Sequence, residues 1–336
     1  MWALTELRAR LDAGDLANAR AAAESVTPFW TAPGPELLEP ALHTAAGLDD
    51  PSIALTLLRP FPVEWVTPAH AGGLTLLAAR YGESWHRDLL NAWFGSRNRW
   101  RYTAGVDRKG WVSALPGLTV ALRDAGAAAT AGWLLAASWA WLDDDIRVWL
   151  RDPSPATRRK QLAELGKPLA GILAAADGTA LAGEIVTVLR EHGDDVLACL
   201  LPMLRAAGPG PSAPLEELAQ DCERRLIAIT GRPERADDDW SVPWSGGCGC
   251  ELCGRLSEFL ASRGERTLEW PLAEARRKHI KNQVSVADLP IRHETWKFGS
   301  PHTLVLTKTD ELFRREATAR KDAADSLEWL TAQRRR

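Results

Sequence analysis

Apolar residues recur every three or four positions through the first 230 residues, which is the spacing of one face of an α-helix. The first segment carries Leu4, Leu7 and Leu11 at this spacing. Further helix-length segments follow, each ended by glycine, proline or aspartate. No segment of this region alternates apolar and polar residues as a half-buried strand would. The pattern therefore predicts a chain that is mainly α.

The helices predicted before residue 230 recur without a fixed period. A pair of helices cannot bury its apolar stripe alone, so each pair must pack on its neighbour. We therefore expect an irregular, α-solenoid-like helical array, of the kind in which helix pairs stack in sequence order.

The pattern changes after residue 240. Residues 291–298 and 302–309 are rich in β-branched and aromatic side chains, and Gly299-Ser300-Pro301 between them is typical of a turn. These two runs predict a β-hairpin. Helices with an apolar stripe are predicted beside it, over residues 252–260, 272–280 and 311–332. The C-terminal region is thus expected to be a small α+β module.

A polar and charged stretch over residues 231–239 separates these two regions. Polar, proline-containing stretches of this kind are typical of domain boundaries. The predicted domains are a helical array over residues 1–235 and an α+β module over residues 240–333.

Composition places the chain among ordinary globular proteins, with 46% hydrophobic and 25% charged residues in 336. No apolar run is long enough to span a bilayer, so we expect no association with a membrane. Five cysteines, three of them clustered, suit a reducing compartment, and the expected location is cytoplasmic. The 16 tryptophans are interpreted as packing anchors between helices.

The net charge of the chain is -3, but its two regions differ. From Ser241 onward the chain has 17 Lys and Arg against 13 Asp and Glu, a balance of +4. Arg276, Arg277, Lys278 and Lys281 lie close together, with Trp270 and Trp296 nearby in the sequence. This mildly basic region makes nucleic acid an alternative partner, although its overall charge is far below that of a dedicated nucleic-acid binder.

Cys248, Cys250 and Cys253 lie within six residues, in a loop that also contains three glycines. Thiols this close are difficult to join by relaxed disulfides, whereas Zn²⁺ takes cysteine and histidine ligands, usually four in a structural site. The cluster therefore predicts a structural zinc ion that stabilises the module. The alternatives are three reduced cysteines near a turn, or a redox-active group.

The fourth ligand must come from elsewhere in the chain. His279 lies on a predicted helix that can fold back on the helix after Cys253, so it is the preferred candidate. His293, His302 and water remain open as alternatives. Four protein ligands would leave no open coordination position.

Several short motifs follow one another in the tail. They are Cys248-x-Cys250-x-x-Cys253-x-x-Leu256-x-x-Phe259-Leu260, Arg277-x-His279, His293-x-Thr295 and Gly299-Ser300-Pro301-x-Thr303-Leu304-Val305-x-Thr307-Lys308. This ordered set, over about residues 244 to 320, resembles the C-terminal tail of large fungal and bacterial proteins described as 2-oxoglutarate/Fe(II) oxygenases. The helical stretch before it is similar to their middle region. The resemblance implies an accessory part of an oxygenase system, without the catalytic domain.

Catalysis in that family is expected from an N-terminal double-stranded β-helix that holds iron through a His-x-Asp pair and a distal histidine. His86-Arg87-Asp88 has this spelling, but Leu89, Leu90 and Trp93 continue after it at helical spacing. We therefore interpret His86 and Asp88 as surface or helix-packing residues on one helix. Cys199 lies among apolar residues and is interpreted as a buried core thiol.

These observations favour a protein that binds a partner over an enzyme, because no phosphate loop or nucleophile motif is found. The expected partner is another protein, bound by the helical array. Nucleic acid bound by the C-terminal module is the alternative, and salt-dependent binding would separate the two.

Overall fold

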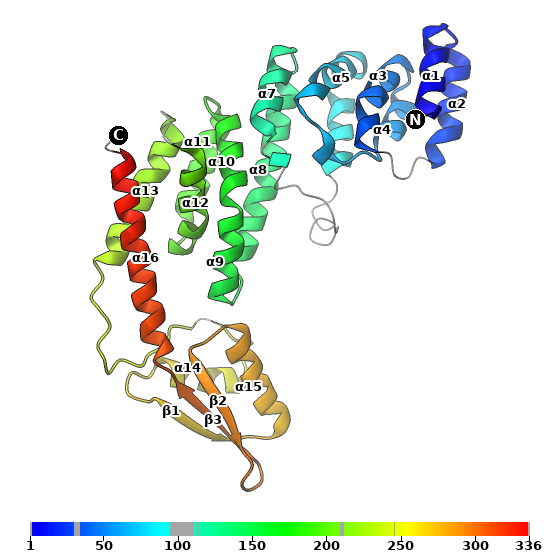
Figure 1. Cartoon of the computed structure of the whole chain (residues 1–336). Coiled ribbons are helices and arrows are strands. Elements are labelled where there is room, and N and C mark those ends of the chain that lie inside the picture. The colour runs from blue at the N-terminus through cyan, green and yellow to red at the C-terminus, as the bar shows by residue number, and fades with distance from the viewer. Residues whose placement is uncertain are drawn as a thin grey trace. The chain divides into compact units, whose positions relative to one another are not determined.

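The computed structural model describes residues 2–29, 34–94, 111–112, 114–208, 212–244 and 246–334. Helices form most of these residues, and the sheet found among them lies between Thr267 and Lys308 (Figure 1). The prediction of a mainly α chain with strands confined to the C-terminal region is therefore confirmed for the described residues.

Helices make up most of the described residues before residue 231. They are α1 Trp2–Asp12, α2 Leu16–Val26, α3 Leu38–Gly47, α4 Pro51–Leu58, α5 Ala71–Phe94, α7 Leu115–Asp124, α8 Ala128–Leu150, α9 Pro155–Glu164, α10 Gly166–Ala176, α11 Ala180–Glu191, α12 Leu197–Ala207 and α13 Ala213–Thr230. Short 3-10 helices cover Thr27–Phe29, Pro35–Leu37, Val63–Trp65, Pro68–His70 and Asp194–Val196.

Helices and strands mix after residue 250. The elements are α14 Glu251–Ala261, β1 Thr267–Pro271, α15 Glu274–Val286, β2 Ile291–Trp296, β3 Thr303–Lys308 and α16 Glu311–Arg334.

The chain divides into two compact units. The first consists of Met1–Asp145, Leu165–Leu189 and Met203–Pro214, and the second of Ile146–Glu164, Arg190–Pro202 and Leu215–Arg336. The domain boundary expected between residues 235 and 240 stays a prediction.

Local chemistry explains where the helices of the first unit begin and bend. Asp50 precedes α4, and its carboxylate accepts the backbone N–H groups of Ser52 and Ile53 at 2.9 and 3.0 Å. An aspartate in this position satisfies N–H groups that the first helical turn leaves free. Helix α5 is interrupted at Gly82, where φ is 84°, a left-handed conformation that favours glycine.

Tryptophans join neighbouring segments of the first unit. The indole N–H groups of Trp85, Trp93 and Trp111 donate to backbone carbonyls at 2.6, 2.7 and 2.8 Å. Trp93 and Trp111 are buried, so each places a large apolar ring in the core and satisfies its single donor. These tryptophans act as the packing anchors that the sequence predicted.

The C-terminal sheet has the strand order β1-β3-β2, and both pairs of strands are antiparallel. Strands β2 and β3 form the predicted hairpin, with Trp296 opposite Thr303 at the end near the turn. Strand β1 was not predicted. It is short and ends in Pro271, which suits the edge of a sheet because proline cannot donate a ladder hydrogen bond.

One face of this sheet packs against α14 and α15. Leu304 and Leu306 of β3 lie in a single cluster with Leu256 and Phe259 of α14 and Ile280 of α15. All five side chains are 0% exposed. Alternate residues of a strand point to opposite faces, so Thr303 and Thr307 lie on the outer face.

Lys308 at the end of β3 is also fully buried. Its ammonium donates to the backbone carbonyl of Ser262 at 2.7 Å and to that of Leu260 at 3.3 Å, beside the ring of Phe259. These carbonyls lie at the C-terminal end of α14, where a helix leaves acceptors without partners. Lys308 therefore ties the sheet to the end of this helix.

The segment before the cysteines is fixed to the same region. The backbone N–H of Trp240 donates to Arg263 and that of Val242 to Leu260, at 2.8 and 2.7 Å. The Trp240 ring packs edge-on against Phe313 with centroids 4.9 Å apart. The cysteine loop therefore begins from a segment whose position beside α14 is fixed.

Helix α16 also contacts the end of α13. Arg320 donates to the carbonyls of Thr230 and Arg232 at 3.0 and 2.6 Å, and Arg235 pairs with Glu316 at 2.5 Å.

Among the described helices none combines the length and the apolar composition needed to cross a bilayer.

Candidate metal centre

The three clustered cysteines lie at the start of α14. Cys250 is the residue immediately before this helix, Cys253 lies in its first turn, and Cys248 belongs to the preceding loop. A helix brings residues three apart in sequence to the same side, so Cys250 and Cys253 project together. Cys248 reaches them because the loop turns back at Gly249, where φ is 74°.

Gly247 is required for the close fit of this loop. Its φ is 114°, and a Cβ placed there would lie 3.0 Å from both the Cβ of Cys253 and the ring of Trp244. Both the positive φ and the two close contacts disfavour a side chain at this position. The glycine therefore allows the loop to approach the first turn of α14.

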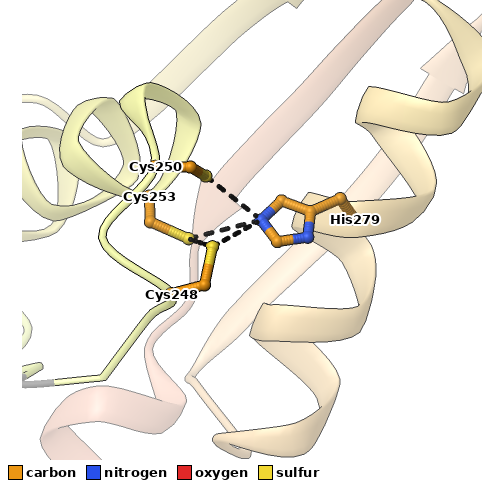
Figure 2. Close-up of side chains that lie close together, drawn as sticks. All are labelled: Cys248, Cys250, Cys253 and His279. Carbon is orange, nitrogen blue, oxygen red and sulfur yellow. Dashed lines mark hydrogen bonds between the residues drawn. The ribbon is translucent and has the colours of Figure 1, made fainter.

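His279 is brought to the cysteines by the packing of α15 on α14. The next residue, Ile280, is fully buried in the core cluster with Leu256 and Phe259. Packing of Ile280 fixes the rotation of α15, and the imidazole on the adjacent position then faces the start of α14. Figure 2 shows the three sulfurs gathered around one nitrogen of the His279 ring.

The ligand atoms lie at metal-site separations. His279 Nε2 is 3.7 Å from Cys248 Sγ, 3.5 Å from Cys250 Sγ and 3.3 Å from Cys253 Sγ, and Cys248 Sγ is 3.7 Å from Cys253 Sγ. All four atoms lie within 4.8 Å of one another. A tetrahedral ion with Zn–S of about 2.3 Å and Zn–N of about 2.0 Å separates its ligands by about 3.8 Å between sulfurs and about 3.5 Å between sulfur and nitrogen. The cluster could therefore hold a metal ion.

The electrostatics of the thiols agree with a cation site. A hydrogen bond from the backbone N–H of Cys253, with the neighbouring thiol of Cys248, lowers the pKa of Cys250 to about 6. Burial, together with the neighbouring Cys248 and Cys250 thiols and the charge of Cys250, raises the pKa of Cys253 to about 11. Without a cation, the Cys250 thiolate therefore opposes ionisation of Cys253. A bound cation would favour that ionisation, because thiolates are the form that ligates metals.

The other two histidines of the module lie apart from this cluster. His293 is on β2 opposite Leu306, and His302 Nδ1 contacts the carbonyl of Gly299 at 3.1 Å in the hairpin. Among the described residues, the group of possible metal ligands consists of Cys248, Cys250, Cys253 and His279. Of the three candidate histidines, the structure brings His279 to the thiols.

The two remaining cysteines are core residues of the second unit. Cys199 on α12 and Cys222 on α13 are both 0% exposed. Burial raises the pKa of each thiol to about 12. The interpretation of Cys199 as a buried core thiol is confirmed. Cys222 is equally buried, although its helix is largely polar in sequence.

The His-x-Asp motif at residues 86–88 does not form a metal site among the described residues. His86 lies on α5 with 2% exposure and bonds Thr130 of α8 at 3.0 Å. Asp88 lies on the same helix but is exposed. Two positions on a helix differ by about 200° around its axis, so the side chains diverge. The interpretation of this pair as helix residues is confirmed.

Sequence reasoning missed the residues that support the cluster without touching it. Lys308 stands in a Thr-Lys-Thr-Asp run, where a lysine is expected to be solvated. Only the carbonyls at the end of α14 explain its burial, and they come from residues more than 40 positions away in the sequence. The glycines beside the cysteines were the available signal for a tight loop.

Comparison of the chain with protein-family models, with curated proteins and with solved structures finds no match. The resemblance of the tail to oxygenase-associated proteins stays a prediction.

Proposed function

We propose that the protein is a binding protein whose C-terminal module is held together by one structural zinc ion. The observation that carries this proposal is the convergence of three sulfurs and one imidazole nitrogen at 3.3–3.7 Å contacts. The ligands would be Cys248, Cys250, Cys253 and His279.

The donor set favours zinc over other metals. Thiolate ligands select soft or borderline ions, and a tetrahedral set of cysteine and histidine is typical of zinc. Four ligands from the protein would leave no position for water or substrate. A metal held in this way contributes to folding, and chemistry at the ion is not expected.

A structural role for the metal ion favours a binding function for the protein. If the ion is structural, the surfaces of the helices and of the module carry the function. The helical region is the longer part of the chain, and a protein is the partner that we propose for it.

Metal analysis of the purified full-length chain tests the proposal. We expect one zinc ion per chain. His279→Ala should lower zinc affinity, and His302→Ala is the matched control because it removes a histidine of the same module outside the cluster. Affinity should also fall with pH, since thiolates and imidazole must lose their protons to bind.

Two results would contradict the proposal. One is a folded module that contains no stoichiometric zinc. The other is loss of zinc in His302→Ala together with full retention in His279→Ala, which would assign the fourth ligand elsewhere.

A further inference from the structure

The β2–β3 hairpin exposes two aromatic side chains. Phe298, just after β2, is 90% exposed, and Trp296 at the end of β2 is 44% exposed. Trp296 lies opposite Thr303 on the outer face of the sheet, away from the core cluster. In Figure 1 the loop that follows β2 projects beyond the rest of the C-terminal module. Two exposed aromatic rings this close together on a projecting hairpin are a candidate interaction surface.

Exposed cations lie at this end of the sheet on two elements, with α15 on the core face and Trp296 on the outer face. Lys297 separates the two aromatic residues in the sequence and is exposed. The first turn of α15 is fastened to the base of the hairpin, because Arg277 donates to the carbonyls of Leu272 and His302. Arg276 and Lys278 flank Arg277 and are both exposed. Trp296, Lys297 and Phe298 with Arg276 and Lys278 are called the hairpin end below.

The cations of the hairpin end are available to a ligand. Among the described residues, Arg276, Lys278 and Lys297 form no ion pair with a carboxylate. Three glutamates are the acidic residues closest to them. Glu274 lies in the first turn of α15 and is exposed. Glu269 and Glu294 face Val305 in the next row of the sheet, and Glu294 pairs with Arg292.

Exposed rings beside unpaired cations match the chemistry of single-stranded nucleic acid. Unpaired bases stack on aromatic side chains whatever their sequence, and a basic surface follows the phosphates. A duplex keeps its bases stacked on one another, so the rings would have nothing to contact. The local charge matters here more than the mild net charge of the whole region.

A membrane fits the hairpin end less well. The residues that follow Phe298 are Gly299, Ser300, Pro301 and His302, so the exposed apolar surface at this end is limited to Phe298 and part of Trp296. A single myristoyl chain, which buries more apolar surface than one phenylalanine, gives only marginal membrane binding.

We propose that the hairpin end binds single-stranded nucleic acid. Trp296 and Phe298 each stack on a base. Lys297, Arg276 and Lys278 contact phosphates. This binding goes beyond the proposed zinc module and uses a surface that contains none of its ligands.

Fluorescence anisotropy with the full-length chain tests the proposal, using a labelled oligothymidylate and a labelled duplex of the same length. We expect the single strand to bind more tightly than the duplex. With three phosphate contacts, affinity should fall roughly 20-fold between about 50 and 200 mM salt.

The variants separate the two kinds of contact. Phe298→Ala and Trp296→Ala should each weaken binding by roughly 5- to 150-fold, the range for loss of one stacked base, with an unchanged salt dependence. Lys297→Gln should weaken binding less and make it less sensitive to salt. Phe29→Ala is the matched aromatic control, since Phe29 is 84% exposed in the other unit. Arg314→Gln, on α16 with 74% exposure, is the matched charge control.

The zinc content and thermal unfolding of every variant are measured alongside. The proposal is supported by a variant that binds the oligonucleotide more weakly than the parent protein but has the same metal content and unfolding temperature. This comparison holds whether or not the parent protein contains zinc. Tighter binding to the duplex, unchanged binding in Phe298→Ala and Trp296→Ala, or binding to phosphatidylserine vesicles without binding to the oligonucleotide would each overturn it.

Discussion

The helical region before residue 231 and the C-terminal module are stabilised in different ways. In the helical region, fully buried leucines recur in one helix after another, as at Leu57, Leu74 and Leu89, so apolar burial is spread along the chain. The module has one small core, formed where α14 and α15 pack on a sheet of three short strands. It also contains the Cys3His cluster and buried Lys308, which connect elements of the module through polar groups. A small core gains most from such cross-links.

Removal of the metal should have the largest effect and should be confined to the module. Structural zinc contributes on the order of 10 kcal/mol to the folding of small domains. We expect chelation to abolish amide protection in β1–β3, α14 and α15 and to preserve it in α3, α4 and α5, as measured by hydrogen exchange.

Re-addition of zinc is the control and should restore protection in the module. Equal loss of protection in α3–α5 would contradict the difference drawn between the two regions. Retained protection in α14 and α15 after complete removal of metal would contradict the role given to the ion.

Loss of the buried lysine should be the next largest effect. Lys308→Met keeps the apolar stem but removes the charged donor to the carbonyls of Ser262 and Leu260. The Leu260 carbonyl still accepts from the Val242 N–H, so the main loss is at the Ser262 carbonyl. The free energy of unfolding of the module should therefore fall by about 1–3 kcal/mol. Urea unfolding monitored by tryptophan fluorescence measures this change. Lys297→Met, at an exposed position, is the control and should leave stability unchanged.

Local patterns predicted the elements well in both regions. Helical spacing predicted the mainly α chain, and the β-branched runs on either side of Gly299-Ser300-Pro301 predicted β2 and β3. Strand β1 was missed because its five residues, Thr267–Pro271, carry a glutamate and end in proline. Its place in the sheet depends on pairing with β3, which lies more than 30 residues later.

The candidate site was predictable for a different reason. Cys248, Cys250 and Cys253 are held together by the covalent chain, so their proximity needs no knowledge of the fold. Selection of His279 from three histidines depended on how α15 packs on α14, which the sequence indicated only as a preference. Lys308 could not be found, because its partners at the end of α14 are brought to it by tertiary structure alone.

A pH dependence is expected in the helical region without any metal. Burial lowers the pKa of His86 from 6.5 to about 4, because a charged imidazolium is unfavourable inside the protein. Below about pH 6.5, His86 binds a proton in the unfolded chain. In the folded chain it stays neutral until about pH 4. Folding stability is therefore fully present above pH 6.5 and decreases as pH falls, by about 3 kcal/mol at pH 4.

His86→Gln should remove this part of the pH dependence. Urea unfolding of the helices, followed by far-UV circular dichroism between about pH 7 and pH 4, measures it. Glu83 and Arg87 line the cavity of about 200 Å³ beside His86 and are unchanged in the variant. His43→Gln, at a half-exposed position on α3, is the control and should keep the dependence of the parent protein. An identical pH profile for His86→Gln and the parent would contradict the assignment to His86.

The smallest effect is expected in the cysteine loop, where Gly247 and Gly249 differ in backbone conformation and in the space around them. Gly247 and Gly249 both have positive φ, 114° and 74°, but a Cβ at Gly247 would meet Cys253 and Trp244 at 3.0 Å, whereas a Cβ at Gly249 would meet nothing within 4 Å. Gly249→Ala carries only the conformational cost of a left-handed residue, about 1–2 kcal/mol. Gly247→Ala adds a steric clash with a cysteine of the cluster, so it should destabilise the module further and lower its zinc affinity. Competition with a chromogenic chelator measures that affinity, and equal values for the two variants would show that the loop relaxes around the added methyl group.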